Sequence, residues 1–280
     1  MKRFLSLFKK NKATGERNTY LLMGVILTGL ILLMVIVGLF YTPYDPTKMD
    51  ASAKMQGISL RHIMGTDNMG RDVFSRVMYG SRITVVIATF TIIIGAGVGT
   101  IIGALAGYYG GMFGEVTMRI IDAMLAFPSI LLSLVFVSLF GTGMYQVAVA
   151  LGISFIPSFA RIVRGEFLRC RNMDYVEVAR LQGVSDIRII FVHILPNIVG
   201  VLLSSVMIGF NNAVLAEAGL SFLGIGSQPP YASLGKMLSD AQSYLFKRPS
   251  YVISIGLVIV LMVLGFSFLG EGIKRIPENK

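Results

Sequence analysis

The chain has 280 residues, of which 54% are hydrophobic and only 14% are charged, and its formal net charge is +10. Because a soluble domain carries about 25% charged residues, this composition excludes an ordinary soluble fold and favours a chain that lies in lipid. The single cysteine, Cys170, excludes an internal disulfide, and two histidines, His62 and His193, provide little for a metal site or a nucleophile–histidine pair. We therefore expect no catalytic residues, no metal ligands and no nucleic-acid partner.

Six apolar segments predict an all-α integral membrane protein. They cover residues 20–41, 83–108, 121–140, 147–162, 198–216 and 251–269. Each can satisfy its backbone polar groups within a helix, as the hydrocarbon core requires. The first segment is longer than the apolar core of a signal peptide, and we expect it to remain as the first span. The predicted location is the cell (cytoplasmic) membrane, crossed several times.

The distribution of Lys and Arg predicts the orientation. One side of the predicted topology carries 16 of these residues and the other carries 9, most of which lie in one long loop. Because cytoplasmic connections are enriched in Lys and Arg, both termini are expected in the cytoplasm. The predicted order is a basic cytoplasmic tail (1–19), the first transmembrane helix (20–41), an extracytoplasmic loop (42–81), a transmembrane core (82–272) and a short cytoplasmic tail (273–280).

The second predicted span carries glycines at four-residue intervals. Gly95, Gly99, Gly103 and Gly107 would form a smooth groove on one helix face, where a neighbouring helix can approach closely. Close helix packing is the favoured role for these residues, and a place on a ligand path is the minor alternative.

Two features are expected to shape the third span. Arg119 and Asp122 lie three residues apart, so on a helix they would share a face and form an ion pair at the membrane boundary. Pro128 lies further along the same segment and is expected to kink the helix.

The connection at residues 172–197 predicts a structured cytoplasmic loop. Asp174 and Glu177 have the spacing of a capping box at the start of a short helix. Gly183 is expected to end that helix, and Ser185 or Asp186 would start a second helix that ends before Pro196. The alternative is an amphipathic helix that lies on the membrane surface without a protein partner.

The same segment resembles the EAA loop of ATP-binding-cassette importer permeases. Glu177-Val-Ala179 is followed after three residues by Gly183, and Leu195-Pro196 closes the motif. Val178 replaces the middle residue of the family pattern, and His193 stands where Ile is usual. Further stretches at 65–82, 107–111 and 217–230 resemble the second, C-type permease subunit of dipeptide, oligopeptide and nickel importers, although the Trp usual after the last stretch is absent.

The resemblance implies a type I importer permease fold with protein partners in the membrane, in the cytoplasm and outside the cell. The chain would form half of a pore for di- or oligopeptides with a homologous second permease subunit, surrounded by membrane lipid. Cytoplasmic ATP-binding subunits would bind ATP and Mg²⁺, so this chain would need no cofactor of its own. These subunits would drive the pore through residues of the EAA loop: Asp174, Glu177, Ala179, Gly183, Leu195 and Pro196. An extracytoplasmic solute-binding protein would deliver the cargo. Nickel or a metal chelate is the alternative cargo, and a secondary transporter or channel is the distant alternative.

Acidic and amide side chains on the outer side are the remaining candidates. Asp67 and Asp72 lie beside glycines in the outer loop, where Thr66 or Asp67 could cap the second span. Either carboxylate could instead contact the solute-binding protein. Glu217, Asn211 and Asn212 lie near the outer end of the fifth span, where polar groups face a cavity, a pathway or another helix.

Overall fold

The computed structural model describes residues 18–229 and 231–275. Within these residues the chain is helical, and the only extended pairing is an isolated bridge between Thr66 and Asp72. The helices are α2 (Thr19–Phe40), α3 (Val73–Tyr109), α4 (Gly111–Leu125), α5 (Ser129–Phe140), α6 (Met144–Cys170), α7 (Asp174–Leu181), α8 (Asp186–Arg188), α9 (Leu195–Phe222), α10 (Leu234–Gln242) and α11 (Pro249–Lys274).

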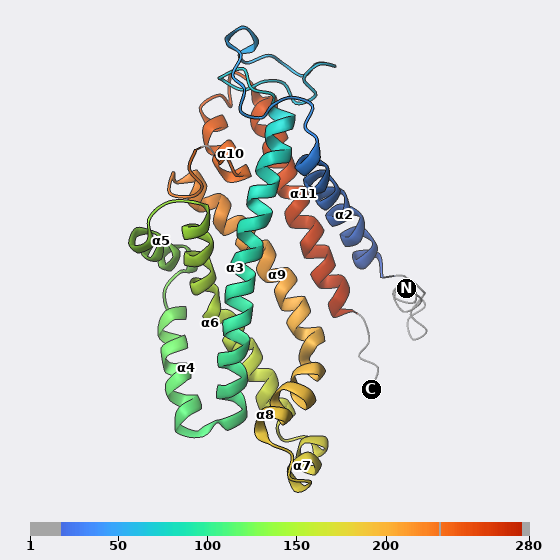
Figure 1. The fold of residues 1–280 in the computed structure, drawn as a ribbon, viewed down its shortest axis with the longest axis vertical. Coiled ribbons are helices and arrows are strands. Elements are labelled where there is room, and N and C mark those ends of the chain that lie inside the picture. The colour runs from blue at the N-terminus through green and yellow to red at the C-terminus, as the bar shows by residue number, and fades with distance from the viewer. Residues whose placement is uncertain (1–17, 230, 276–280) are drawn as a thin grey trace.

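Five helical segments of the described chain are long and apolar enough to cross a membrane. They are α2, α3, α6, the continuous run Asp186–Phe222 that contains α9, and α11. The pair α4 and α5 supplies a sixth crossing if the two helices together form one span. Along the elongated bundle, α2 and α9 run in one direction, and α3, α6 and α11 run in the other (Figure 1).

The prediction of one kinked helix at residues 121–140 is wrong. The apolar segment forms two helices whose axes differ by 92°, with the break immediately before α5. Pro128 lies at the N-terminal boundary of α5, where its missing N–H is not needed by the helix. Proline also disfavours the helical conformation at the residue before it, so the chain turns sharply instead of bending gently.

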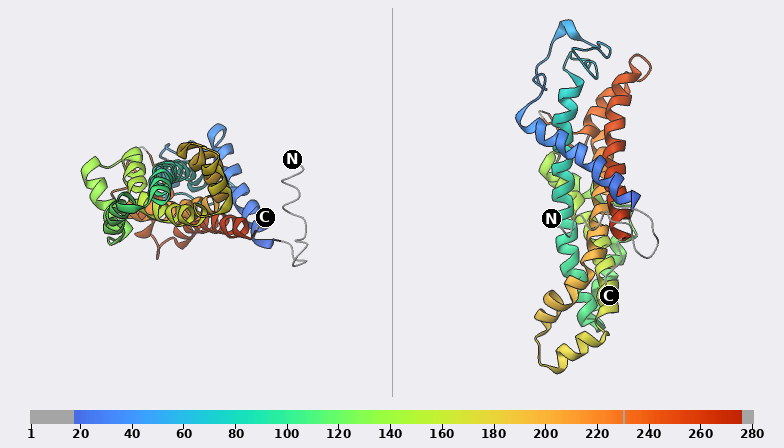
Figure 2. Two further views of the ribbon diagram at one scale, coloured as in Figure 1. Left: turned by 90° about the horizontal axis from the view of Figure 1, so that it is seen from below. Right: turned by 90° about the vertical axis from the view of Figure 1, so that its right-hand side faces the viewer.

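Helical structure begins within the predicted extracytoplasmic loop of residues 42–81. Helix α3 begins at Val73, well before residue 82, and runs for 37 residues. At 1.5 Å per residue this helix is about 55 Å long, which exceeds the roughly 30 Å of a hydrocarbon core. A helix of this length extends beyond the hydrocarbon core, and its N-terminal end lies beside the outer loop, as the side view shows (Figure 2).

The bundle contains two close helix pairs. Helices α3 and α6 run in the same direction, whereas α2 and α11 run antiparallel at one edge (Figures 1 and 2). At the start of α2, Asn18 donates through Nδ2 to the carbonyl of Gly272, at 2.7 Å. The first turn of α2 thus meets the last turn of α11 (Figure 1).

Candidate functional site: the coupling loop and the translocation face

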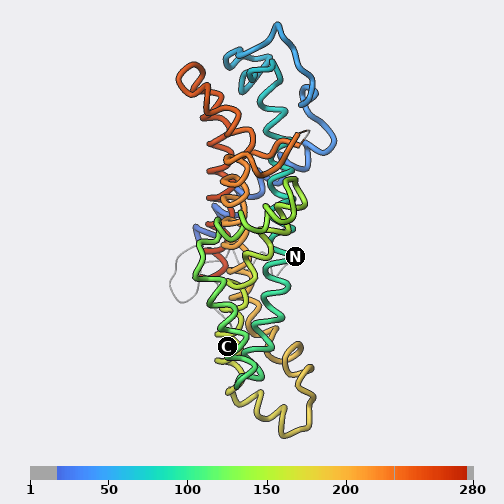
Figure 3. Tube along the Cα trace, turned by 90° about the vertical axis from the view of Figure 1, so that its left-hand side faces the viewer, coloured from blue at the N-terminus to red at the C-terminus, as the bar shows by residue number. Residues whose placement is uncertain are grey.

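Residues 172–197, here called the coupling loop, form a compact projection at the end of the bundle opposite the outer loop (Figure 3). Helix α7 buries Val176 and Ala179 on one face. The opposite face leaves Val178 50% exposed and Leu181 84% exposed, with Glu177 also exposed. An apolar side chain presented this fully on a loop beyond the membrane is available for burial by a partner.

Gly183 ends α7 by taking a left-handed backbone conformation, with φ of +75°. Its amide donates to the carbonyl of Arg180, and the amide of Val184 donates to the carbonyl of Ala179, at 3.1 Å. Such bonds satisfy carbonyls at a helix C-terminus, and glycine is favoured there because it carries no Cβ. The turn directs the chain from α7 into α8.

The predicted capping box at Asp174 is wrong. Met173 occupies the N-cap position in an extended conformation, and no side chain accepts a hydrogen bond from the first turn. Asp174 and Glu177 instead lie within the first turn of α7. Their carboxylates there oppose the positive end of the helix dipole, which is favourable without a direct bond.

The second helix of the coupling loop does not end before Pro196, so that prediction is also wrong. Helix α8, a π-helical turn at Ile189–Ile194 and α9 form one continuous run. The amide of Leu195 donates to the carbonyl of Ile190, five residues earlier. A wider turn of this kind accommodates Pro196, which has no N–H and would clash with the carbonyl four residues before it in a regular helix.

Polar contacts attach the coupling loop to the end of α3. The hydroxyl of Tyr108 donates to Oδ1 of Asp186, at 2.5 Å. The guanidinium of Arg180 lies over the Tyr108 ring, 5.2 Å from its centroid. Arg171 donates through Nη1 to the carbonyl of Tyr108, at 3.2 Å. Three separate parts of the loop region therefore converge on one tyrosine.

The four glycines on α3 pack against α6. A Cβ at Gly95, Gly99 or Gly107 would lie 2.6–2.8 Å from the Cβ of Phe155, Phe159 or Phe167 respectively. At Gly103 the same atom would clash with the carbonyl of Ala160. The α6 contacts thus repeat at the same four-residue interval, and the two helices approach too closely for any larger side chain.

Asp122 does not pair with Arg119 as predicted. Its carboxylate instead forms an ion pair with Arg161 on α6, and both side chains are about half exposed. The pair links α4 to a neighbouring helix rather than stabilising α4 itself.

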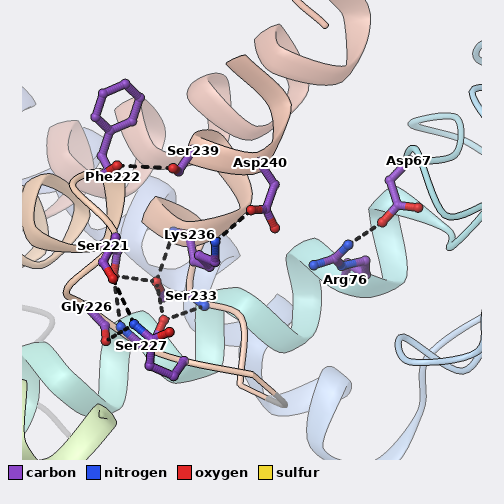
Figure 4. A network of polar contacts seen from close by, with 12 residues as sticks. Asp67, Arg76, Ser221, Phe222, Gly226, Ser227, Ser233, Lys236, Ser239 and Asp240 are labelled. Carbon is purple, nitrogen blue, oxygen red and sulfur yellow. Dashed lines mark hydrogen bonds and ion pairs between the residues drawn. The ribbon is translucent and has the colours of Figure 1, made fainter. Parts of the chain in front are cut away.

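Glu217 lies in a buried hydroxyl network at the outer end of α9. Its carboxylate accepts from Ser221, at 2.6 Å, and from Thr84 of α3, at 3.3 Å. Ser221 also accepts from Ser233 and from the amide of Ser227, as Figure 4 shows. Glu217 is fully buried, so its carboxylate ties α9 to α3 and to the loop before α10, and it does not face a pathway within this chain.

Asp67 and Asp72 are also enclosed, within the outer loop and the start of α3. Asp67 pairs with Arg76 of α3 (Figure 4) and also with Arg71, the latter at 2.7 Å. Burial acts to raise the pKa of Asp67, but the charges of Arg76 and Arg71 and the Arg71 amide hold this pKa below its ordinary value. Neither carboxylate is free to contact a second protein, because Asp67 and Asp72 are 0% and 4% exposed.

Asp72, rather than Thr66 or Asp67, caps α3. Its Oδ2 accepts from the amide of Ser75, at 2.8 Å, and its Oδ1 lies 2.8 Å from Nδ1 of His62. The carboxylate therefore connects the first turn of the longest helix to the outer loop.

A cavity opens between α5, α6 and α9, with a volume of about 360 Å³. Its polar lining consists of Ser129, Ser154, Ser158, Ser205 and Asn212, and no charged residue contributes. Of the three polar residues predicted near the outer end of the fifth span, Asn212 lines this cavity, whereas Glu217 and Asn211 do not. The side-chain oxygen of Asn211 is buried without a hydrogen-bond partner among the described residues.

Sequence reasoning missed Tyr108, Asp186 and Arg161 as contact residues. Each makes its contact across 39 or more residues of sequence, and no local spacing records a pairing of that kind. Tyr108 carried one indirect signal, since it stands at the end of a glycine-rich helix, two residues before Gly110.

The fold defines a polytopic, all-helical membrane protein with a structured loop projecting from one end. Residues 99–279 match the family described as "Binding-protein-dependent transport system inner membrane component", and the chain belongs to this family. It is accordingly a multi-pass cell-membrane subunit of an ATP-binding-cassette importer rather than an enzyme or a secondary transporter.

Relatives of established name agree with this assignment. The dipeptide transport permease DppC of Alkalihalophilus pseudofirmus is 36% identical over 95% of this chain and 87% of its own length. The glutathione transport permease GsiD of Pectobacterium atrosepticum is 39% identical over 91% of this chain and 86% of its own length. The inward-facing MetNI methionine transporter superposes with a TM-score of 0.61 at 17% identity, covering 72% of this chain and 96% of the other, which shows the shared type I permease fold.

Proposed function

We propose that this chain forms one half of a translocation pore that imports di- and oligopeptides, with a homologous permease subunit as the other half. The named relatives move a dipeptide or glutathione, both of which are small peptides. They favour a peptide over the nickel or metal-chelate cargo that the sequence alone left open.

The coupling loop is the observation that carries the mechanism. Its α7 face presents Leu181 and Val178 to solvent beyond the membrane, next to the carboxylate of Glu177. A cytoplasmic ATPase subunit that binds ATP and Mg²⁺ would bury these side chains in a groove, which is a common mode of helix recognition. Closure of two ATPase subunits would then move the loop and, through the bundle, the pore. An extracytoplasmic solute-binding protein would deliver the peptide from the opposite side.

The cavity between α5, α6 and α9 supports a peptide pathway. Its serine hydroxyls and the Asn212 amide are neutral hydrogen-bonding groups in a mostly apolar wall. Such groups can bind the amides of a peptide backbone without selecting for side-chain charge. We expect Asn212→Leu to reduce dipeptide uptake without loss of complex assembly, whereas Leu215→Ile in the same wall leaves uptake unchanged.

The experiment is uptake by cells in which the gene is deleted and then restored. Restored cells should accumulate a labelled dipeptide, glycyl-leucine, and the deletion strain should not. Accumulation of ⁶³Ni²⁺ but not of the dipeptide would refute the peptide assignment.

Docking of the ATPase is tested on the purified complex. Full burial of a leucine contributes about 1.5–3 kcal/mol, so Leu181→Ala should weaken retention of the ATPase subunit at least about tenfold. Gln182→Ala alters the adjacent exposed residue and is the matched control. Equal retention of the ATPase by both variants would contradict the proposed docking surface.

A further inference from the structure

Tyr108 occupies the inner end of α3 and is almost completely buried, at 5% exposure. It lies in an apolar cluster with Val163 and Phe167 of α6 and Val176 of α7. Its hydroxyl leaves this cluster and donates to Asp186, the first residue of the continuous helical run that ends at Phe222. The hydrogen bond therefore joins the end of one spanning helix to the beginning of another.

The polar and charged partners of Tyr108 come from the coupling loop or its borders. Arg171 follows α6, Arg180 belongs to the last turn of α7, and Asp186 begins α8. Arg171 binds the Tyr108 carbonyl, Arg180 covers the ring, and Asp186 accepts from the hydroxyl. The hydrogen bond to Asp186 has a charged acceptor and a fixed direction, which makes it stronger and more specific than a hydrogen bond between neutral groups.

Helix α3 continues from Tyr108 to the outer side of the molecule. Along the way the glycine contacts fix it against α6. At its far end Asp72 caps it, and Arg76 pairs with Asp67 of the outer loop. A displacement imposed on Tyr108 therefore reaches the outer loop through a single helix that is packed along most of its length.

We infer that Tyr108 and Asp186 form a clasp that makes α3 move with the coupling loop. This inference rests on the proposed function, because it assigns the clasp a role in coupling ATP hydrolysis to cargo movement. Both are positioning residues that act through α3, since neither lines the cavity. Without the hydroxyl contact, the coupling loop would still move with the ATPase, but less of that movement would be transmitted to α3.

The test uses the complete complex in proteoliposomes, with its ATPase subunits and binding protein. It measures the number of glycyl-leucine molecules imported for each ATP hydrolysed. Tyr108→Phe and Asp186→Ala should each lower this ratio about two- to thirtyfold, the range found for residues that carry coupling between sites. In Tyr108→Phe, which lies outside the coupling loop, basal ATP hydrolysis and retention of the ATPase should stay unchanged, which separates positioning from folding.

Three comparisons make the result specific. The double variant should be no worse than either single variant, because both remove the same contact. Asp186→Asn keeps a side-chain oxygen that accepts from the tyrosine and should retain most of the ratio. Tyr109→Phe removes a neighbouring hydroxyl that lies outside the clasp, and it should behave as the unaltered protein.

An unchanged ratio in Tyr108→Phe would overturn the clasp, and so would losses that add in the double variant. Failure of Tyr108→Phe to assemble would also overturn it, because the contact would then serve folding alone. If the unaltered complex imports no dipeptide, the proposed cargo is refuted instead. The clasp is then decided by whether Tyr108→Phe, unlike Tyr109→Phe, loses the stimulation of ATP hydrolysis by the binding protein.

Discussion

A methyl group at Gly99 should force α3 and α6 apart. The added Cβ would lie 2.6 Å from the Cβ of Phe159, 2.8 Å from the carbonyl oxygen of Ile156 and 3.1 Å from the amide nitrogen of Ala160. None of these atoms can rotate away, because two belong to the backbone and the third is fixed to it. Overpacking of this kind destabilises a structure by about 1–3 kcal/mol.

Gly97→Ala on the same helix is the matched control, since a Cβ there meets no atom within 4 Å. Both variants gain about 1 kcal/mol of helix propensity, so the difference between them isolates the packing term. In a thermal unfolding measurement on the purified complex, Gly99→Ala should unfold about 2–12 °C below Gly97→Ala. Equal unfolding temperatures would refute the close approach of α3 to α6.

Three further predictions concern separate parts of the chain. Asp67→Asn leaves the buried Arg76 without its charged partner and should lower the free energy of unfolding by about 3–5 kcal/mol, measured by thermal unfolding at pH 7. The pKa of Asp67 is lowered in the folded state, so its stabilising contribution is complete above its ordinary pKa and is lost only as the pH falls through the lowered value. A decrease in the free energy of unfolding between pH 7 and 5 in the unaltered protein, but not in Asp67→Asn, would contradict this. Gly183→Ala should strain a left-handed position by about 1–2 kcal/mol and reduce uptake, whereas Gly183→Asn should retain more uptake, because asparagine adopts this conformation more readily. Glu217→Gln should keep its hydroxyl partners and preserve uptake, whereas Glu217→Leu leaves Ser221 and its neighbours poorly paired and should reduce the amount of assembled complex, measured by affinity purification.

Local patterns in the sequence predicted the spans and the glycine groove because both depend on periodicity along one helix. Gly95, Gly99, Gly103 and Gly107 mark the contact face of α3 without naming its partner. The predicted ion pair of the third span failed because spacing along one helix reports only local partners. Asp122 had Arg119 on its own helix but binds Arg161 on another.

The coupling loop shows the same limit. Glycine at position 183 predicted the end of α7, because few other residues tolerate the left-handed conformation found there. Pro196 predicted a helix end, but the preceding π-helical turn absorbs the missing N–H within a continuous run. Whether a proline ends a helix depends on the width of the turn before it, and sequence spacing does not report that width.

The exposed side chains of the bundle indicate which face meets a partner. Exposed apolar residues do not distinguish a subunit interface from a lipid-facing surface, because an apolar side chain packs about equally well against lipid and against another helix. Polar side chains do distinguish them, since an unpaired polar group is unfavourable in hydrocarbon. The face formed by α5, α6 and α9 exposes Ser129, Ser158 and Asn212 around the cavity. Contact with lipid would be unfavourable for these polar side chains. This face is therefore better suited to contact a second permease subunit or the aqueous path between the two subunits.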